Sequence, residues 1–281
     1  MAGRGGIAWA PEAAQALKGV PALVRPLARR KVEERVRGEG RDQVVLADFA
    51  AAEARFRAVM AGRSDKELAQ LMPAANRPGA ELVVLESCRA KLSGCPNAIM
   101  DTDPWREALQ EWLAANQVSE RLRAKVQGDQ VLFHHKLRLS LAGCPNGCSR
   151  PQIADLALVG TVSPLFDPDD CTACGACAAV CPDGAIAVAE TVSWDLDQCL
   201  GCLGCSQSCP SGAVSLGPVE ARVLMGGKLG RHPHLAREVA VVQGPEQAVA
   251  LMGQAIDDYI EHAPQGERFA AWWASQHKEG E

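Results

Sequence analysis

The sequence contains no apolar run long enough to cross a membrane, and no basic region followed by an apolar core of the kind that marks a secretory signal. We therefore expect a cytoplasmic protein. Phosphate loops, dinucleotide-binding fingerprints and serine-type triads are also missing, so direct use of a nicotinamide cofactor is not expected. The 281 residues are 47% hydrophobic and 22% charged, which is ordinary for a globular chain of two or three small domains.

Twelve cysteines without a secretory signal indicate metal ligation rather than disulfide bridges. Eight of them form two copies of the pattern C-x2-C-x2-C-x3-C-P, in which Pro182 and Pro210 follow the last cysteine. Three thiolates at this spacing can hold one [4Fe–4S] cluster, while the fourth ligates the other cluster. Structural zinc needs two pairs of ligands and leaves the triplets unexplained. We assign one cluster to Cys171, Cys174, Cys177 and Cys209 (the first repeat set) and another to Cys199, Cys202, Cys205 and Cys181 (the second repeat set).

The other four cysteines, called the core set below, form two pairs at the ends of predicted strands. Cys88 and Cys95 follow an apolar run at 82–85, and Cys144 and Cys148 follow an alternating stretch at 135–141. Sulfur ligands without a nearby histidine favour a third [4Fe–4S] cluster over catalytic zinc. Structural zinc and unconnected buried cysteines stay open as alternatives.

Basic residues accompany the core set in the sequence. They are His134, Lys136 and Arg138, which we expect on one face of the second strand, and Arg89, Lys91 and Arg150, which flank the cysteines. A cationic pocket of this kind would bind an oxyanion or a cofactor with many carboxylates. Lys136, Arg138 and Arg150 are the first candidates for anion contacts and proton supply. A strand face that meets solvent, or that balances the charge of the thiolates, is the alternative.

Charge is distributed unevenly along the chain. No basic residue lies between Arg150 and Arg222, a stretch with nine acidic residues, whereas residues 1–41 hold nine lysines and arginines against four glutamates. An acidic surface raises the rate of encounter with a basic electron donor protein, although a merely solvated surface explains it equally well. The basic segment lacks interleaved aromatic residues, which argues against nucleic acid.

Residues 1–62 are predicted to form three short helices, from Pro11 to Gly19, from Pro21 to about Arg37, and from Leu46 to about Met60, and 62–80 a linker. Near the C-terminus we predict strands at 223–225 and 239–242 and helices at 247–260 and 267–275. Between them, Gly226 and Gly227 form a turn whose backbone amides could approach an anion. Trp272 and Trp273 are better explained by packing than by a cofactor.

Three resemblances to known families accompany these patterns. Residues 166–216, with Cys-Pro-Asp-Gly-Ala-Ile at 181–186 and Cys-Pro-Ser-Gly-Ala-Val at 209–214, resemble a bacterial two-cluster ferredoxin. The segment with Trp9, Pro11, Glu12, Arg25 and Glu33 resembles the small helical domain of a subunit of light-independent protochlorophyllide reductase. That resemblance implies an accessory domain near a tetrapyrrole; a docking or oligomerisation bundle is the alternative.

The third resemblance is to the sirohaem-dependent sulfite and nitrite reductases, especially the dissimilatory type with an inserted ferredoxin. It is carried by 141–151, 153–160, Gly226-Gly227-Lys228-Leu229-Gly230-Arg231-His232-Pro233 and Gly266-Glu267-Arg268-Phe269. It implies that the core set holds a [4Fe–4S] cluster and that Cys148 also bridges to the iron of sirohaem. It places Gly226, Gly227, Lys228 and Arg231 beside the sirohaem. Six residues rather than the usual five separate Cys88 from Cys95, and the N-terminal half of such a reductase has no counterpart in the sequence.

The sequence thus predicts an α+β protein with four parts. These are a helical bundle at 1–62, a sulfite-reductase-like core at 80–165 and 217–281, and a two-cluster ferredoxin inserted at 166–216. The expected function is electron transfer through three [4Fe–4S] clusters to sirohaem, which reduces a small oxyanion such as sulfite or nitrite. A haem-free electron-transfer subunit is the main alternative, and a protein acting on a tetrapyrrole is a weaker one. A homo-oligomer or a second redox subunit could complete the site.

Overall fold

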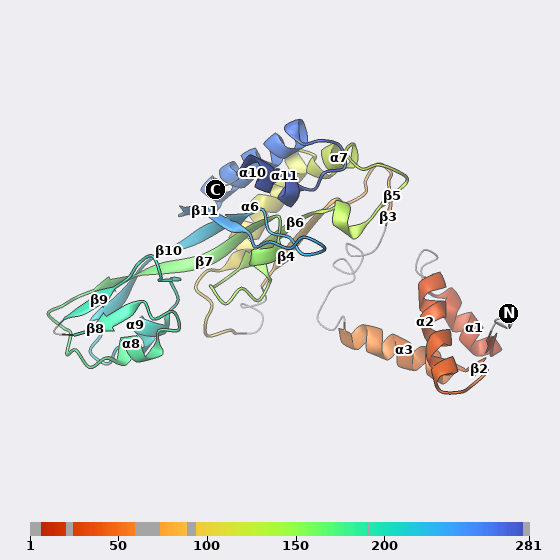
Figure 1. The fold of residues 1–281 in the computed structure, drawn as a ribbon, viewed down its shortest axis with the longest axis horizontal. Helices are drawn as coiled ribbons and strands as arrows, with labels where there is room; N and C mark the ends of the chain where they lie inside the picture. The colour runs from red at the N-terminus through yellow and green to blue at the C-terminus, as the bar shows by residue number, and fades with distance from the viewer. Residues whose placement is uncertain (1–6, 21–24, 60–73, 89–93, 190, 278–281) are drawn as a thin grey trace. The chain divides into compact units, whose positions relative to one another are not determined.

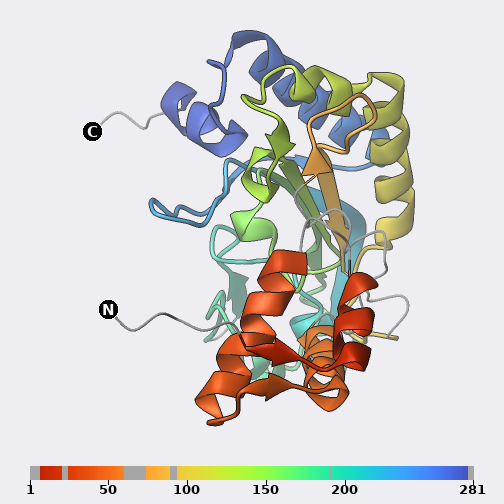
Figure 2. The ribbon, with the colours of Figure 1, turned by 90° about the vertical axis from the view of Figure 1, so that its right-hand side faces the viewer.

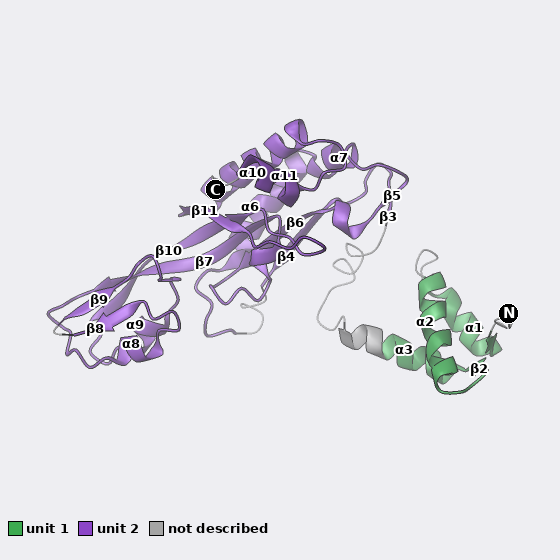
Figure 3. Cartoon of the chain, in the orientation of Figure 1, with its two compact units in different colours: residues 1–73 green, residues 74–281 purple. Residues whose placement is uncertain are grey.

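The computed structural model describes residues 7–20, 25–59, 74–88, 94–189 and 191–277. The chain divides into two compact units, residues 1–73 and 74–281, which Figure 3 shows in different colours. Each unit has its own apolar core. Among the helices that the structure describes, none is both long and apolar enough to span a membrane.

The described part of unit 1 contains three helices and one short parallel ladder. The elements are β1 (Ala8–Trp9), α1 (Pro11–Lys18), α2 (Arg25–Gly38), β2 (Gln43–Val44) and α3 (Leu46–Val59). The buried residues are Ile7, Ala13, Val32, Val36 and Val44. The Trp9 indole donates a 2.9 Å hydrogen bond to the Glu33 carboxylate, which ties β1 to α2. The described parts of the helices agree with the prediction, whereas the predicted start of the second at Pro21 and end of the third at Met60 lie outside the described residues. The two-residue strands are too short to leave an alternating pattern in the sequence.

Unit 2 is built on a five-stranded mixed sheet in the order β11-β10-β7-β6-β4 (Figure 1). The strands are β4 (Val83–Ser87), β6 (Leu137–Ala142), β7 (Leu156–Phe166), β10 (Val214–Met225) and β11 (Arg237–Val242). β4, β6 and β7 are parallel, while β10 runs antiparallel to both of its neighbours. Because parallel strands need long crossovers, the connections from β4 to β6 and from β6 to β7 have room for helices and long loops.

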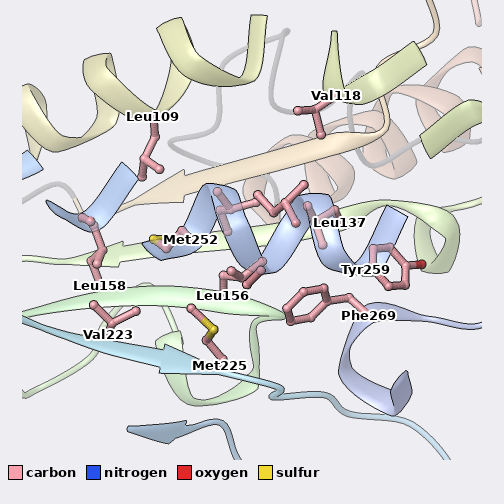
Figure 4. Packing of buried hydrophobic residues seen from close by; sticks show 14 of the residues in the cluster. Leu109, Val118, Leu137, Leu156, Leu158, Val223, Met225, Met252, Tyr259 and Phe269 are labelled. Carbon is pink, nitrogen blue, oxygen red and sulfur yellow. The ribbon is translucent and has the colours of Figure 1, made fainter. Parts of the chain in front are cut away.

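Helices cover one face of this sheet (Figures 1 and 2). They are α6 (Thr102–Ala115), α7 (Val118–Arg123), α10 (Pro245–His262) and α11 (Phe269–Gln276). In Figure 4, Leu156 and Leu158 of β7 lie opposite Met252 of α10, beside Val223 of β10. Successive side chains of a strand point to opposite faces of the sheet, so these residues face the helices and their neighbours in the strand face away from them. Asp101 caps α6, since its Oδ1 accepts from the Asp103 amide at 3.1 Å.

Short elements complete the core of unit 2. They are β3 (Ala74–Ala75), which pairs with β5 (Gln130–Val131), and the 3-10 turns η1 (Phe133–His135) and η2 (Pro151–Ile153). The strand predicted at 135–141 therefore begins two residues late. His135 belongs to η1 instead, where its Nδ1 accepts a 3.2 Å hydrogen bond from the Leu132 amide.

β7 and β10 extend past the sheet as a two-stranded ribbon that ends at the pairing of Phe166 with Val214. The lobe at its tip contains α8 (Ala176–Val180), β8 (Ile186–Val188), β9 (Val192–Trp194) and α9 (Gly204–Ser208). The boundary predicted between 216 and 217 falls inside β10, which passes it with a bulge between Leu216 and Val219. The lobe and the sheet thus share two continuous strands.

Leu158→Ala should lower the free energy of unfolding by about 3 kcal/mol, because it leaves a cavity between the sheet and α10. Urea unfolding followed by circular dichroism measures this. Leu165 lies on the same strand but is 52% exposed, so Leu165→Ala should cost less than about 1 kcal/mol. Equal losses in the two variants would contradict the assignment of the inner face of β7.

Candidate metal centres

The parallel pairing of β4 with β6 brings the two halves of the core set to one edge of the sheet. The ladder runs from Val83 opposite Leu137 to Ser87 opposite Leu141. The Cys88 amide continues it with a 2.8 Å hydrogen bond to the Leu141 carbonyl. Cys88 and the loop that begins at Gly143 therefore leave their strands side by side.

Gly143 joins the two cysteine pairs. Its amide donates to Cys88 Sγ at 3.2 Å, and its carbonyl accepts from the amides of Ile99 and Met100 at 2.9 Å each. A Cβ at this position would lie 2.9 Å from the Met100 carbonyl oxygen and 3.3 Å from Cys88 Sγ. The segment that follows Cys95 is thus fastened to the Cys144 loop, and only glycine allows so close an approach.

The four thiols of the core set influence one another electrostatically. Burial raises the pKa of Cys144, and the charges of Cys148, Cys88 and Cys95 raise it further. Cys148 is the exposed member, and its sulfur accepts a 3.1 Å hydrogen bond from the Asn146 amide group. Four thiolates confined in this way need bound cations to balance their charge, and iron in a cluster supplies them. The donor set therefore fits a [4Fe–4S] cluster.

Two serines fix the loop that carries Cys144 and Cys148. Ser140 Oγ donates to the Ser149 carbonyl, and Ser149 Oγ donates to the Leu141 carbonyl, each at 2.8 Å. Both serines are buried, so these bonds hold the end of the loop against β6. The sequence analysis missed this pair. The only sign of it in the sequence is that one serine stands on each side of the cysteine pair, nine residues apart.

The first repeat set gathers at the tip of the lobe. All four of its cysteines line one small cavity together with Phe166, Val192 and Val214. Burial raises the pKa of Cys177, and the charges of Cys174 and Cys209 raise it further. Cys209 thus comes to the triplet of the other repeat, which is the exchange that the two-cluster arrangement requires.

The second repeat set lies around α9. Burial raises the pKa of Cys205, and the charges of Cys202 and Cys199 add to this effect. A Cβ on Gly204 would lie 3.7 Å from both Cys202 Sγ and the Val180 carbonyl oxygen. Because Val180 immediately precedes Cys181, α8 delivers that cysteine to the side of the second triplet. Among the residues that the structure describes, no three His, Cys, Asp or Glu side chains are arranged to hold a single metal ion.

Lys136 lies at the wrong end of β6 for the predicted anion site. The six residues of β6 separate it from the cysteine loop by roughly 20 Å at about 3.3 Å per residue. It is 3% exposed, and with His134 and Arg268 it lines a cleft of about 270 Å³. Burial lowers its pKa. His134 belongs to η1, so the expected row of His134, Lys136 and Arg138 on one strand face is wrong.

Arg138 and Arg150 have structural contacts. Arg138 donates a 3.2 Å hydrogen bond to the Ile153 carbonyl, and its guanidinium lies 5.5 Å from the centre of the Phe133 ring. Arg150 adopts a left-handed conformation with φ of 60° after the cysteine loop, and donates to Glu86 at 3.3 Å. Its side chain is 54% exposed, so of the three predicted anion ligands Arg150 alone is both accessible and next to the core set. Arg89 and Lys91 lie outside the described residues.

The loop at 226–236 packs against the end of the cysteine loop. The Gly226 amide donates to the Asp155 carbonyl at 2.8 Å, and the Lys228 amide to the His234 carbonyl at 2.9 Å. These two amides are therefore not available to an anion. A Cβ on Gly227 would lie 2.5 Å from the Gln152 carbonyl oxygen, so close packing explains this glycine. The side chains of Lys228 and Arg231 are partly and fully exposed, respectively.

Asp155, which the sequence analysis did not select, is a buried carboxylate behind this loop. Its Oδ2 accepts a 2.9 Å hydrogen bond from the Arg138 amide. Burial raises the pKa of Asp155 to about 6, although the hydrogen bond from Arg138 and the charge of Arg268 act in the opposite direction. Asp155 joins β6 to the start of β7 and contributes no ligand to the cysteine sets.

Residues 86–275, more than half of the chain, match the protein family described as nitrite and sulphite reductase 4Fe-4S domain. The chain belongs to this family. Residues 9–53 match the family described as the proto-chlorophyllide reductase 57 kD subunit. The resemblances to the sulfite and nitrite reductases and to protochlorophyllide reductase, both predicted from the sequence, are thereby confirmed.

Known members of the reductase group share short stretches with this chain. The coenzyme F420-dependent sulfite reductase of Methanocaldococcus jannaschii is 38% identical over 60 residues, which are 21% of this chain and 10% of that protein. One subunit of the anaerobic sulfite reductase of Salmonella typhimurium is 36% identical over 52 residues, which are 18% of this chain and 15% of that subunit. The matches thus span a small part of each relative.

Two solved structures resemble this member of the nitrite and sulphite reductase family. Dissimilatory sulfite reductase I aligns with a TM-score of 0.46 and 20% identity over 66% of this chain and 48% of the other. The NirA protein of Mycobacterium tuberculosis aligns with a TM-score of 0.33 and 17% identity over 60% and 22% of the two chains.

Gly143→Ala should remove the cluster of the core set, because its Cβ would displace either Cys88 or the segment after Cys95. The expected result is a loss of about four irons per chain, with the two repeat sets still loaded. Iron analysis of anaerobically purified protein measures this. Gly38 has no atom within 4 Å of the position of a Cβ, so Gly38→Ala is the control and should keep all its iron. Full iron content in Gly143→Ala would show that the glycine is not required.

Proposed function

We propose that this protein is an iron–sulfur reductase chain that passes electrons through two ferredoxin-type [4Fe–4S] clusters to a third, which is coupled to sirohaem for the reduction of sulfite or nitrite. The observation that carries the proposal is the core set: two cysteine pairs from adjacent parallel strands, fastened together through Gly143. Membership of the nitrite and sulphite reductase 4Fe-4S family supports it. The sulfite reductases named above support sulfite as a substrate.

Electrons enter at the lobe in this proposal. The exchange of Cys209 into the cavity of the first triplet supports a ferredoxin with two clusters. The surface around this lobe has exposed carboxylates at Asp167, Asp169, Asp170, Asp195 and Asp197. Opposite charge on a donor protein would raise the rate of encounter, so we propose a basic electron donor.

The exposed position of Cys148 supports the coupling to sirohaem. Its sulfur lies at the surface, while the other members of the core set are partly buried. When bound, sirohaem would supply the iron at which the oxyanion is reduced. Cys148 would hold that group from the protein side. Arg150 is an exposed cation directly after the loop with Cys148, and in the neighbouring loop at 226–236 Arg231 is exposed and Lys228 partly exposed. All three would attract the carboxylates of sirohaem and the oxyanion.

A second function is favoured by one specific observation. The matched stretches make up 10% and 15% of the two sulfite reductase relatives, so the activity of either whole protein need not lie in the part that this chain matches. A haem-free subunit that carries electrons to a separate catalytic chain would need the three cysteine sets but not the cations beside Cys148. The presence of these cations therefore favours the sirohaem reductase over the haem-free subunit.

Protein purified without oxygen from cells that make sirohaem should hold about thirteen irons per chain, from three clusters and one haem. Its absorption spectrum should show a Soret band and a red-shifted visible band, and the protein should then be assayed with sulfite and nitrite. About twelve irons with only broad cluster absorption would support the electron carrier instead. About eight irons would show that the core set holds no cluster.

A further inference from the structure

One strand, β7, contacts all three cysteine sets in order. Gly160 contacts the loop of the core set, because a Cβ there would lie 2.8 Å from the Gly143 carbonyl oxygen. Thr161 and Val162 contact the loop that joins Cys199 to Cys202. Phe166, at the end of β7, lines the cavity of the first repeat set. Residues 161 and 166 are separated by about 17 Å along an extended strand.

The middle contact is a close packing of two backbones. Thr161 Oγ1 donates to the Leu200 carbonyl at 3.2 Å, and the Val162 amide donates to the Gly201 carbonyl at 3.2 Å. A Cβ on Gly201 would overlap Thr161 Oγ1 and lie 2.7 Å from the Val162 carbonyl oxygen. Leu200 and Gly201 are the two residues between the first two ligands of the second repeat set.

The first copy of the repeat provides an internal comparison. Ala173 occupies the position equivalent to Gly201, between Cys171 and Cys174. Both residues have a positive φ, 52° for Ala173 and 68° for Gly201. The cluster loop therefore accepts a side chain in this conformation when the side chain is exposed, as it is at Ala173. Gly201 must be glycine because β7 occupies the space, not because of the loop conformation alone.

The contact continues from β7 to the core set without a gap. Gly160 precedes Thr161 and packs on Gly143, whose amide is hydrogen-bonded to Cys88 Sγ. A Cβ on Gly160 would lie 2.6 Å from the Met100 Cβ as well as 2.8 Å from the Gly143 carbonyl oxygen, so glycine at 160 lets the β7 backbone pack against both the cysteine loop and the segment that follows Cys95. A short route thus runs from Leu200 through its hydrogen bond to Thr161, along the backbone to Gly160, and across a close contact to Gly143, whose amide is hydrogen-bonded to a ligand of the core set.

We infer that the second repeat set holds the cluster that passes electrons to the core set, that the first repeat set holds the outer cluster, and that Gly201 and Thr161 are the positioning residues of this junction. The inference rests on the proposed function. The outer cluster would receive electrons first, since Cys174 and Ala173 are exposed beside the acidic segment at 167–170.

Matched ligand deletions test the order. Cys202→Ala and Cys174→Ala change equivalent positions of the two repeats, and each should remove about four irons per full-length chain. In the reduced protein, a neighbouring paramagnetic cluster speeds the spin relaxation of the core-set cluster, which electron paramagnetic resonance measures by power saturation. We expect Cys202→Ala to lose this enhancement and Cys174→Ala to retain it. The reverse pattern, or equal effects in the two variants, would overturn the inference.

Gly201→Ala tests the junction without removing a ligand. It should keep the iron content of the unaltered protein but lose part of the relaxation enhancement, because its Cβ separates the loop from β7. Ala173→Gly is the control and should leave the enhancement unchanged. Thr161→Val removes the hydrogen bond to Leu200 at nearly constant volume and should act in the same direction if Gly201→Ala does not fold. Unchanged relaxation in Thr161→Val would contradict the role of the junction.

The iron content of the unaltered protein separates a failure of this inference from a failure of the proposed function. Without a third cluster, the unaltered chain would hold about eight irons and show no core-set signal, which would overturn both. With the third cluster present and the order reversed, the proposed function would stand and the inference alone would be wrong.

Discussion

The arrangement of the metal centres depends on the pairing of parallel strands in the middle of the sheet. β4, β6 and β7 leave the sheet in the same direction, so the segments that follow β4 and β6 emerge together. The hydrogen bond from the Cys88 amide to the Leu141 carbonyl extends that pairing by one residue, to the first cysteine itself. A shift in register would move Cys88 away from the loop with Cys144 and would also turn the apolar face of β4 outward. Core packing and metal ligation therefore select the same register.

Much of this could be predicted from the sequence because it follows from local patterns. The helices of unit 1, and the strands that lead to Cys88 and to the loop with Cys144, all have clear signals in periodicity and spacing. The length of β7 and β10 was not predictable in the same way. Residues 156–162 of β7 are all buried and alternation of burial begins only at Ser163, so no single periodicity marks the whole strand.

The placement of charge was predicted least well, for a physical reason. Lys136 and Arg138 fit an alternating strand in the sequence, but alternation indicates a face and not an end of the sheet. The preceding residues 133–135 form a 3-10 turn, which places Lys136 at the start of β6 and beside the 270 Å³ cleft. Arg138 is held by the Ile153 carbonyl and the Phe133 ring. Which cations remain accessible is decided by tertiary contacts that no spacing encodes.

The glycines show how a duplicated sequence can acquire unequal roles. The two cysteine repeats are alike in spacing, and at positions 173 and 201 they are alike in backbone conformation. At these two positions, Gly201 packs on the middle of β7 and the close approach excludes a side chain, whereas Ala173 is exposed. Gly143 and Gly160 are likewise too close to their neighbours for a side chain, where β7 packs against the cysteine loop of the core set. An internal repeat of this kind predicts two equivalent clusters, whereas contact with a third element makes one of them the inner cluster. In the proposed electron path, the direction of flow would thus arise from packing on β7 rather than from the ligands themselves.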